Sequence, residues 1–204
     1  MAILRTEDGK TLSTHTEINE LIQPTQIGTF RLPANTHDLL KSITLPLTRA
    51  DAERILATFD PELDQTLCTE GFVHRRVGCL ARGNAADPRN KSVVGLYTQP
   101  GPSGIMPAEA LTKYSTPHRL GADDRHHVYA GMIVKGLILP DGKQVMLYVG
   151  PGEWIRLHKT TVNWPVFPYD GPNIAVSYFD RKPQTEDGNY NMNLETNLSA
   201  RISA

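Results

Sequence analysis

Histidine side chains are concentrated in one quarter of this sequence. Four of the seven histidines lie within Pro117–Phe167, at His118, His126, His127 and His158. An imidazole gains or loses a proton near neutral pH, and it is also a common metal ligand. The cluster therefore predicts a site for proton transfer or for metal binding, and the histidines alone leave both open.

A carboxylate accompanies one of these histidines at a spacing that matters in a strand. Asp124 and His126 are two residues apart, so on a β-strand both side chains point to the same face. A carboxylate beside an imidazole raises its basicity and fixes its tautomer. We interpret the pair as a candidate general base, with His118 as a second acid or base.

The same stretch has the pattern of an antiparallel sheet. Two apolar runs, Val128–Leu139 and Val145–Val149, flank Pro140–Asp141–Gly142, and Asp-Gly between β-rich runs predicts a hairpin. A second turn at 149–152 precedes a third strand that starts near Trp154. Three strands in series with Gly/Pro turns indicate part of a sandwich or barrel.

The rest of the chain predicts a β-rich protein with a small helical N-terminal part. Helices are expected at 17–22, after a cap at Ser13 or Thr14, and at 52–59. A short helix is expected at 107–111, and 98–105 is expected to be irregular. Further strands are expected at Ala2–Arg5, Ile27–Leu32, Phe72–Leu80, Ser92–Tyr97 and Asn173–Asp180. We predict a single domain with an extension at 1–70, a core at 71–180 and a polar tail at 181–204.

The charge and composition of the chain argue against two kinds of binding partner, nucleic acids and membranes. The 204 residues carry 21 basic and 22 acidic side chains, a net charge of -1, which argues against nucleic acid or an anionic membrane. The two cysteines give no disulfide framework, and no apolar run approaches the roughly 20 residues of a membrane span. The first residues lack the apolar region of a secretory signal. We expect a cytoplasmic protein whose partner is a small-molecule substrate.

Two segments resemble the paired motifs of the cupin superfamily. The first motif has the form G-x5-H-x-H-x3,4-E-x6-G, and the sequence matches its spacing at His118, Asp124 and Gly131. The second motif has the form G-x5-P-x4-H-x2-N, and here Gly152 precedes Asn163 at the position of its histidine. The resemblance implies a cupin-type antiparallel β-barrel, or double-stranded β-helix, that often dimerises.

Within the cupins the sequence is similar to the acireductone dioxygenase family. The matching segments are TPHRLGADDRHHVYAG at Thr116–Gly131 and PGEWIRLHKTTVN at Pro151–Asn163. LCTEGF at Leu67–Phe72 is similar to the segment before that family's first barrel strand. The resemblance covers about residues 1–180 and implies Fe(II)- or Ni(II)-dependent dioxygenation of an acireductone.

The resemblance also implies a ligand set, which this sequence keeps only in part. The four metal-ligand positions fall on His118, Leu120, Asp124 and Asn163, and the family's active-site arginine position falls on His126. Leucine has no donor atom, and asparagine replaces an expected histidine. The same register points His118, Asp124 and His126 inward and His127 outward.

We therefore expect an enzyme that uses His118, Asp124 and His126 in acid–base chemistry and needs no cofactor. It would be an isomerase, cyclase or lyase that acts on an oxygenated, enolisable metabolite. The first alternative is a dioxygenase with Fe(II) or Ni(II) held by the same three residues, a two-histidine-one-carboxylate set. The second is a cupin that binds a ligand without catalysis.

Four more residues are candidate substrate contacts, namely Leu120, Arg156, Asn163 and Trp164. An inward-pointing Arg156 would hold a substrate carboxylate in a bidentate manner, whereas on the surface it would have no such role. Trp164 stacks on substrate or packs in the core. His127 and His158 are interpreted as packing or surface residues.

Overall fold

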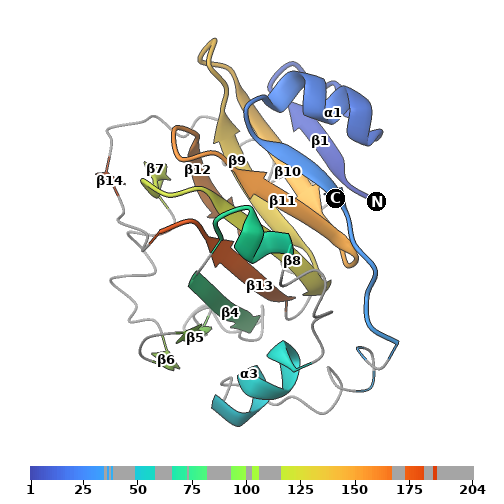
Figure 1. The fold of residues 1–204 in the computed structure, drawn as a ribbon. Helices are drawn as coiled ribbons and strands as arrows, with labels where there is room; N and C mark the ends of the chain where they lie inside the picture. Colours follow the sequence, from blue (N-terminus) through green and yellow to red (C-terminus); the bar gives the residue numbers. More distant parts are fainter. Residues whose placement is uncertain are drawn as a thin grey trace, which may run out of the picture.

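Two antiparallel β-sheets that face each other form most of the structure (Figure 1). The computed structural model describes residues 1–34, 36, 38, 49–57, 66–72, 74–81, 93–99, 103–105, 116–166, 173–181 and 186–187. Within these residues the first sheet has the order β14 (Glu186–Asp187), β7 (His118–Arg119), β12 (Val162–Val166), β9 (Ile133–Ile138), β10 (Gln144–Val149), β1 (Ile3–Thr6) and β2 (Thr11–Leu12). The second sheet has the order β3 (Gln26–Thr29), β11 (Glu153–Leu157), β8 (Asp124–Ala130), β13 (Asn173–Phe179), β4 (His74–Ala81), β5 (Val93–Gln99) and β6 (Ser103–Ile105).

The predicted hairpin is present between β9 and β10. These strands pair from Ile138 opposite Gln144 to Ile133 opposite Val149. Gly142 has φ +86°, a left-handed conformation that glycine adopts without steric cost. The Asp141 side chain accepts a hydrogen bond from Lys143 N at 3.1 Å, which holds the turn from the side. The Asp-Gly signal is therefore confirmed.

The apolar run Val128–Leu139 is not one strand. It contains the end of β8, in the second sheet, and the whole of β9, in the first sheet. The break falls at Gly131, whose φ of +67° interrupts the pleat. β10 and β11 also lie in different sheets, on either side of the turn at 149–152. The chain thus crosses between the sheets at Gly131 and at the turn 149–152, which hydrophobicity alone did not show.

The N-terminal segment contributes strands to both sheets. β1 pairs with β10, and β3 pairs with β11. Between them, α1 (His15–Ile22) is capped by Thr14, whose side chain accepts from Glu17 N, and it buries Ile18 and Ile22. The buried carboxylate of Glu153 at the start of β11 accepts from Ala2 N at 2.6 Å and Gly150 N at 2.9 Å. The carboxylate therefore ties the first residues to the turn before β11.

The core lies between the sheets and sets which face of each strand is inside. Its members come from both sheets and α1, and they include Val128 of β8, Leu137 of β9, Leu147 of β10 and Ile155 and Leu157 of β11. Side chains alternate along a strand. Even-numbered residues of β8 and odd-numbered residues of β9 therefore point toward the space between the sheets.

The outer face of the first sheet has a tight contact between Gly136 and Trp164. The two residues pair across β9 and β12, and a Cβ atom at Gly136 would overlap the Trp164 indole. We expect Gly136→Ala to destabilise the protein by about 3 kcal/mol, because overpacking forces the fully buried indole to move.

Urea unfolding measures this effect, with Gly150→Ala as the matched control. A Cβ at Gly150 would meet its nearest neighbour at 3.6 Å, an ordinary contact, so we expect a change within about 0.5 kcal/mol. Equal losses in the two variants would contradict the role assigned to the Gly136–Trp164 contact.

Most other predicted elements are present where the structure describes them. The strands predicted at Ala2–Arg5, Phe72–Leu80 and Ser92–Tyr97 correspond to β1, β4 and β5, and the second helix corresponds to α3 (Arg49–Leu56). The expectation of irregular structure at 98–105 is wrong in part, because β5 continues to Gln99 and β6 pairs with it. The helix predicted at 107–111 and most of the tail lie outside the described residues. No helix among the described residues is long and apolar enough to cross a membrane.

Candidate active site

Three polar side chains form an inward row on the first sheet. His118 of β7 pairs directly with Asn163 of β12, and the Lys135 Nζ of β9 lies 3.5 Å from Asn163 Oδ1. All three are buried, with exposed fractions of 0%, 1% and 2% for His118, Asn163 and Lys135. Asn163 also pairs with Leu137, a core residue, so the row lies at one end of the apolar core. The ring of His118 is oriented by its Nδ1 atom, 2.7 Å from Thr116 O.

A second row lies on the second sheet and consists of Asp124, His126 and Ser177. The His126 Nε2 atom is 2.6 Å from Asp124 Oδ2, and its Nδ1 atom is 2.5 Å from Ser177 Oγ. Ser177 of β13 stands directly opposite His126 in the strand register. At 2.6 Å the ring nitrogen and the carboxylate oxygen are close enough for a proton to pass between them, so the two groups form a candidate acid–base unit.

The register places this second row inside the protein. Asp124 pairs with Leu157 and His126 pairs with Ile155, and both partners belong to the core between the sheets. His118, Asp124 and His126 therefore all face the interior, as the cupin register implied. Their chemical roles remain proposals.

His127 points away from this space, as expected. It lies on the opposite face of β8, and its ring packs against Phe30 at 4.9 Å and Tyr178 at 5.7 Å between centroids. Burial, together with the nearby Arg125 and His126, lowers the pKa of His127 to about 3. At neutral pH it is therefore a neutral packing residue.

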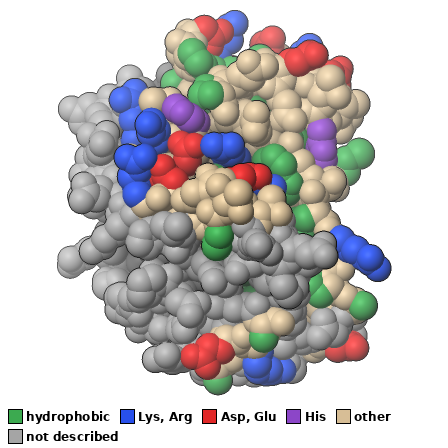
Figure 2. Space-filling view, viewed as in Figure 1, with side chains coloured by type: hydrophobic (Ala, Val, Ile, Leu, Met, Phe, Trp, Pro, Cys, Tyr) green, Lys and Arg blue, Asp and Glu red, His purple; other side chains and the backbone are tan. Residues whose placement is uncertain are grey.

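Arg156 lies outside the interior, which corrects the expectation of a substrate contact there. It pairs with Arg125 on the outer face of the second sheet, and its guanidinium binds Asp123 at 2.9 Å. Burial alone would raise the pKa of Asp123, but the Lys159 backbone N–H and Arg156 hold that pKa below its usual value. On the face drawn in Figure 2, described acidic and basic side chains are interspersed, consistent with such ion pairs.

The other two candidate substrate contacts, Trp164 and Leu120, are both buried. Trp164 is fully buried on the outer face of the first sheet, over Gly136, so its side chain points away from His118 and Asn163. Leu120 is 7% exposed and follows β7 directly. Of the four, only Asn163 is seen to contact another polar side chain of the interior.

Sequence reasoning missed two residues of these rows. Lys135 lies within an apolar run that was interpreted as core, although its even spacing from Leu137 and Leu139, which puts it on their face of a strand, was a usable signal. Ser177 lies in a strand with no motif around it. Only the pairing of β13 with β8 places it beside His126.

The residues present do not fit iron or nickel in the way that the resemblance implies. Leu120 offers no donor atom, and Asn163 Oδ1 faces the Lys135 ammonium, whose positive charge opposes a divalent cation. Among the described residues, which include His118, Asp124 and His126, no group of three His, Cys, Asp or Glu side chains is placed to hold a metal ion.

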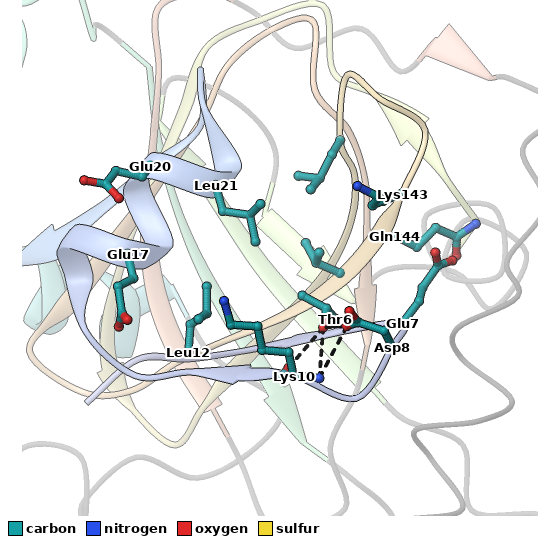
Figure 3. A pocket seen from close by; sticks show the side chains of 12 residues that line it. Thr6, Glu7, Asp8, Lys10, Leu12, Glu17, Glu20, Leu21, Lys143 and Gln144 are labelled. Carbon is teal, nitrogen blue, oxygen red and sulfur yellow. Dashed lines mark hydrogen bonds between the residues drawn. The ribbon is translucent and has the colours of Figure 1, made fainter.

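A separate open pocket of about 690 Å³ lies elsewhere on the surface (Figure 3). It is lined by residues of β1, α1 and the β9–β10 hairpin, among them Lys10, Glu17, Leu21 and Lys143. None of the candidate site residues named above belongs to its lining. Its location therefore does not bear on the interior chemistry.

Two known proteins are similar to this chain, one in sequence and one in fold. No protein-family model matches the chain. It is 23% identical over 184 residues to an acireductone dioxygenase of Trichodesmium erythraeum, which covers 88% of this chain and 89% of that protein. It also superposes with a TM-score of 0.67 and 15% identity on the acireductone dioxygenase from Bacillus anthracis with a cadmium ion in its active centre, over 92% of this chain and 98% of that one.

The two facing antiparallel sheets have a cupin-type fold, the fold of this solved structure. The likeness to these two acireductone dioxygenases, in sequence to the first and in fold to the second, extends over nearly the whole length of the chain.

Proposed function

We propose that this chain is an enzyme of the acireductone dioxygenase type, acting on an acireductone or a related enediol. The observation that carries the proposal is the Asp124–His126 contact of 2.6 Å, buried in a fold similar to that of proteins with this activity in their name. The dioxygenase alternative is better supported by these comparisons than a reaction without oxygen.

The first step assigned to the chain's own residues is removal of a proton from the substrate. An enediol conjugated to a carbonyl is acidic, and its anion is the form that reacts with electrophiles such as O2. The Asp124–His126 unit accepts the proton, and Ser177 fixes the ring of His126 through Nδ1. His118 faces the same space from the first sheet and is assigned a second acid–base role. These side chains are at most 7% exposed, so bulk water has little access to them.

A second candidate function follows from the altered ligand positions. Leu120 and the Lys135-bound Asn163 favour acid–base catalysis without redox chemistry, such as isomerisation, cyclisation or elimination of an enolisable metabolite. The same Asp124–His126 unit would begin this reaction. The two candidates differ in whether O2 is consumed.

Oxygen uptake with an acireductone substrate distinguishes them. Uptake above the protein-free rate, lost in His126→Ala, would support the dioxygenase-type reaction. Exchange of substrate hydrogen for deuterium without oxygen uptake would support the second candidate. Binding without either reaction would overturn both and leave a ligand-binding cupin.

Metal content gives a separate prediction. We expect protein purified without a histidine tag to hold well below one equivalent of iron or nickel before dialysis against chelator, and its Tm to be unchanged afterwards. Elemental analysis and thermal unfolding measure this, with Leu120→His/Asn163→His as the comparison variant, expected to retain more metal. Near one equivalent in the wild type, lost together with activity, would contradict the prediction.

A further inference from the structure

Lys135 places a positive charge inside the candidate site. It lies on β9 in the inward row, is 2% exposed, and reaches Asn163 Oδ1 at 3.5 Å. Asn163 pairs with His118 in the register, so the ammonium lies on the same side of the interior as that imidazole. The Asp124–His126 pair lies on the inner face of the other sheet, because its strand partners Leu157 and Ile155 belong to the same core cluster as Leu137.

A lysine such as Lys135 is uncommon at a buried position next to the apolar core. Removing its charge from water is costly, and a buried charge is retained where it interacts with other polar groups or with a ligand. In a dry interior it also attracts an anion more strongly than it would at the surface. Its three N–H donors allow it to hold Asn163 and a further oxygen atom together.

The proposed reaction creates such an oxygen. When Asp124–His126 removes a proton from an enediol, the negative charge that develops on the substrate oxygens needs a fixed positive group nearby. The comparison family implies a metal ion for this purpose, but the ligand positions here hold Leu120 and a lysine-bound Asn163.

We propose that the Lys135 ammonium binds the anionic oxygen of the substrate and supplies the positive charge of this site. The inference rests on the proposed function for its substrate class, an enediolate. Asn163 then acts as a positioning residue that directs the lysine, in place of a metal ligand.

Calorimetric titration with ascorbate, a stable enediolate at pH 7, tests this without turnover. The experiment uses the full chain under anaerobic conditions, and the neutral 2,3-di-O-methyl ether of ascorbate is the control ligand. We expect wild-type protein to bind ascorbate about tenfold more tightly than the ether, because a desolvated charge pair contributes only with the anion. Equal affinities would overturn the proposal, whatever the variants show.

The variant Lys135→Met, which keeps most of the length of the side chain and removes the charge, is expected to weaken ascorbate binding about tenfold and leave ether binding unchanged. The control is Lys143→Met, which removes an exposed lysine paired with Asp141 at 2.8 Å on the hairpin. It is expected to bind both ligands like the wild type. Unchanged ascorbate affinity in a folded Lys135→Met protein would overturn the proposal.

The binding and activity measurements test the role of Lys135 and the proposed function separately. A wild-type protein that binds ascorbate through Lys135 but does not react with an acireductone would contradict the proposed function alone. Full turnover of an acireductone by Lys135→Met would contradict the inference alone.

Discussion

His126→Ala is expected to lower kcat on an acireductone substrate by about 10²–10⁴-fold, the usual contribution of a positioned acid–base group. The ring contacts both Asp124, at 2.6 Å, and Ser177, at 2.5 Å, so its removal breaks up the pair to which we assign removal of the substrate proton. Asp124→Asn should have an effect of similar size. The double variant should be little worse than either single one, because the two residues act together. Steady-state oxygen uptake or substrate deuterium exchange measures the loss.

The matched control is His158→Ala. His158 is partly exposed, and its Nδ1 contacts Thr160 Oγ1 at 2.7 Å outside the interior, so we expect near-wild-type kcat. His126→Gln keeps more of the side-chain volume and separates lost chemistry from lost packing. If His126→Gln folds normally and retains full activity, His126 is a packing residue and the assignment of the proton transfer to it is wrong.

A second large effect is expected in the pH dependence of stability, and it comes from the neighbouring His127. Its pKa in the folded protein is about 3, whereas an unfolded chain has the ordinary value near 6.5. Between these two pKa values His127 is protonated in the unfolded state and neutral in the folded state. The free energy of unfolding therefore decreases as pH falls below 6.5. The loss attributable to His127 is about 2 kcal/mol by pH 5 and about 3 kcal/mol by pH 4.

Urea unfolding of wild type and His127→Phe at several pH values isolates this contribution. Phenylalanine cannot titrate, and it retains the edge contacts that His127 makes with Phe30 and Tyr178. The difference between the two unfolding free energies should therefore change by about 2 kcal/mol from pH 7.5 to pH 5, to the disadvantage of the wild type. Parallel pH profiles would show that His127 is protonated in the folded protein or is not buried there.

His126 and His127 are adjacent in the sequence, but their side chains point to opposite faces of the second sheet. His126 points into the space between the sheets, where it meets Asp124 and Ser177. His127 points to the outer face of the second sheet, where aromatic rings surround it. One imidazole is therefore proposed as a reagent and the other is packing, although they are next to each other in the sequence.

Local patterns in the sequence determined the hairpin, the start of α1 and the shared strand face of Asp124 and His126. The Asp-Gly pair specified the β9–β10 hairpin, and Thr14 specified the start of α1. The spacing of Asp124 and His126 placed both on one face of a strand. These features depend on backbone conformation and on a side-chain period of two, and both act within a few residues.

The tertiary structure alone decided which side chains meet. Ser177 lies 51 positions from His126 and touches it only because β13 and β8 pair in that register. Lys135 reaches Asn163 across β9 and β12, and Arg156 faces outward because β11 joins the second sheet. A sequence carries the period of each strand, but the register between strands is set by non-local packing and by the turns that change sheets. For this reason the pairing of Asp124 with His126 could be predicted from the sequence, whereas the contacts of Ser177 and Lys135 could not.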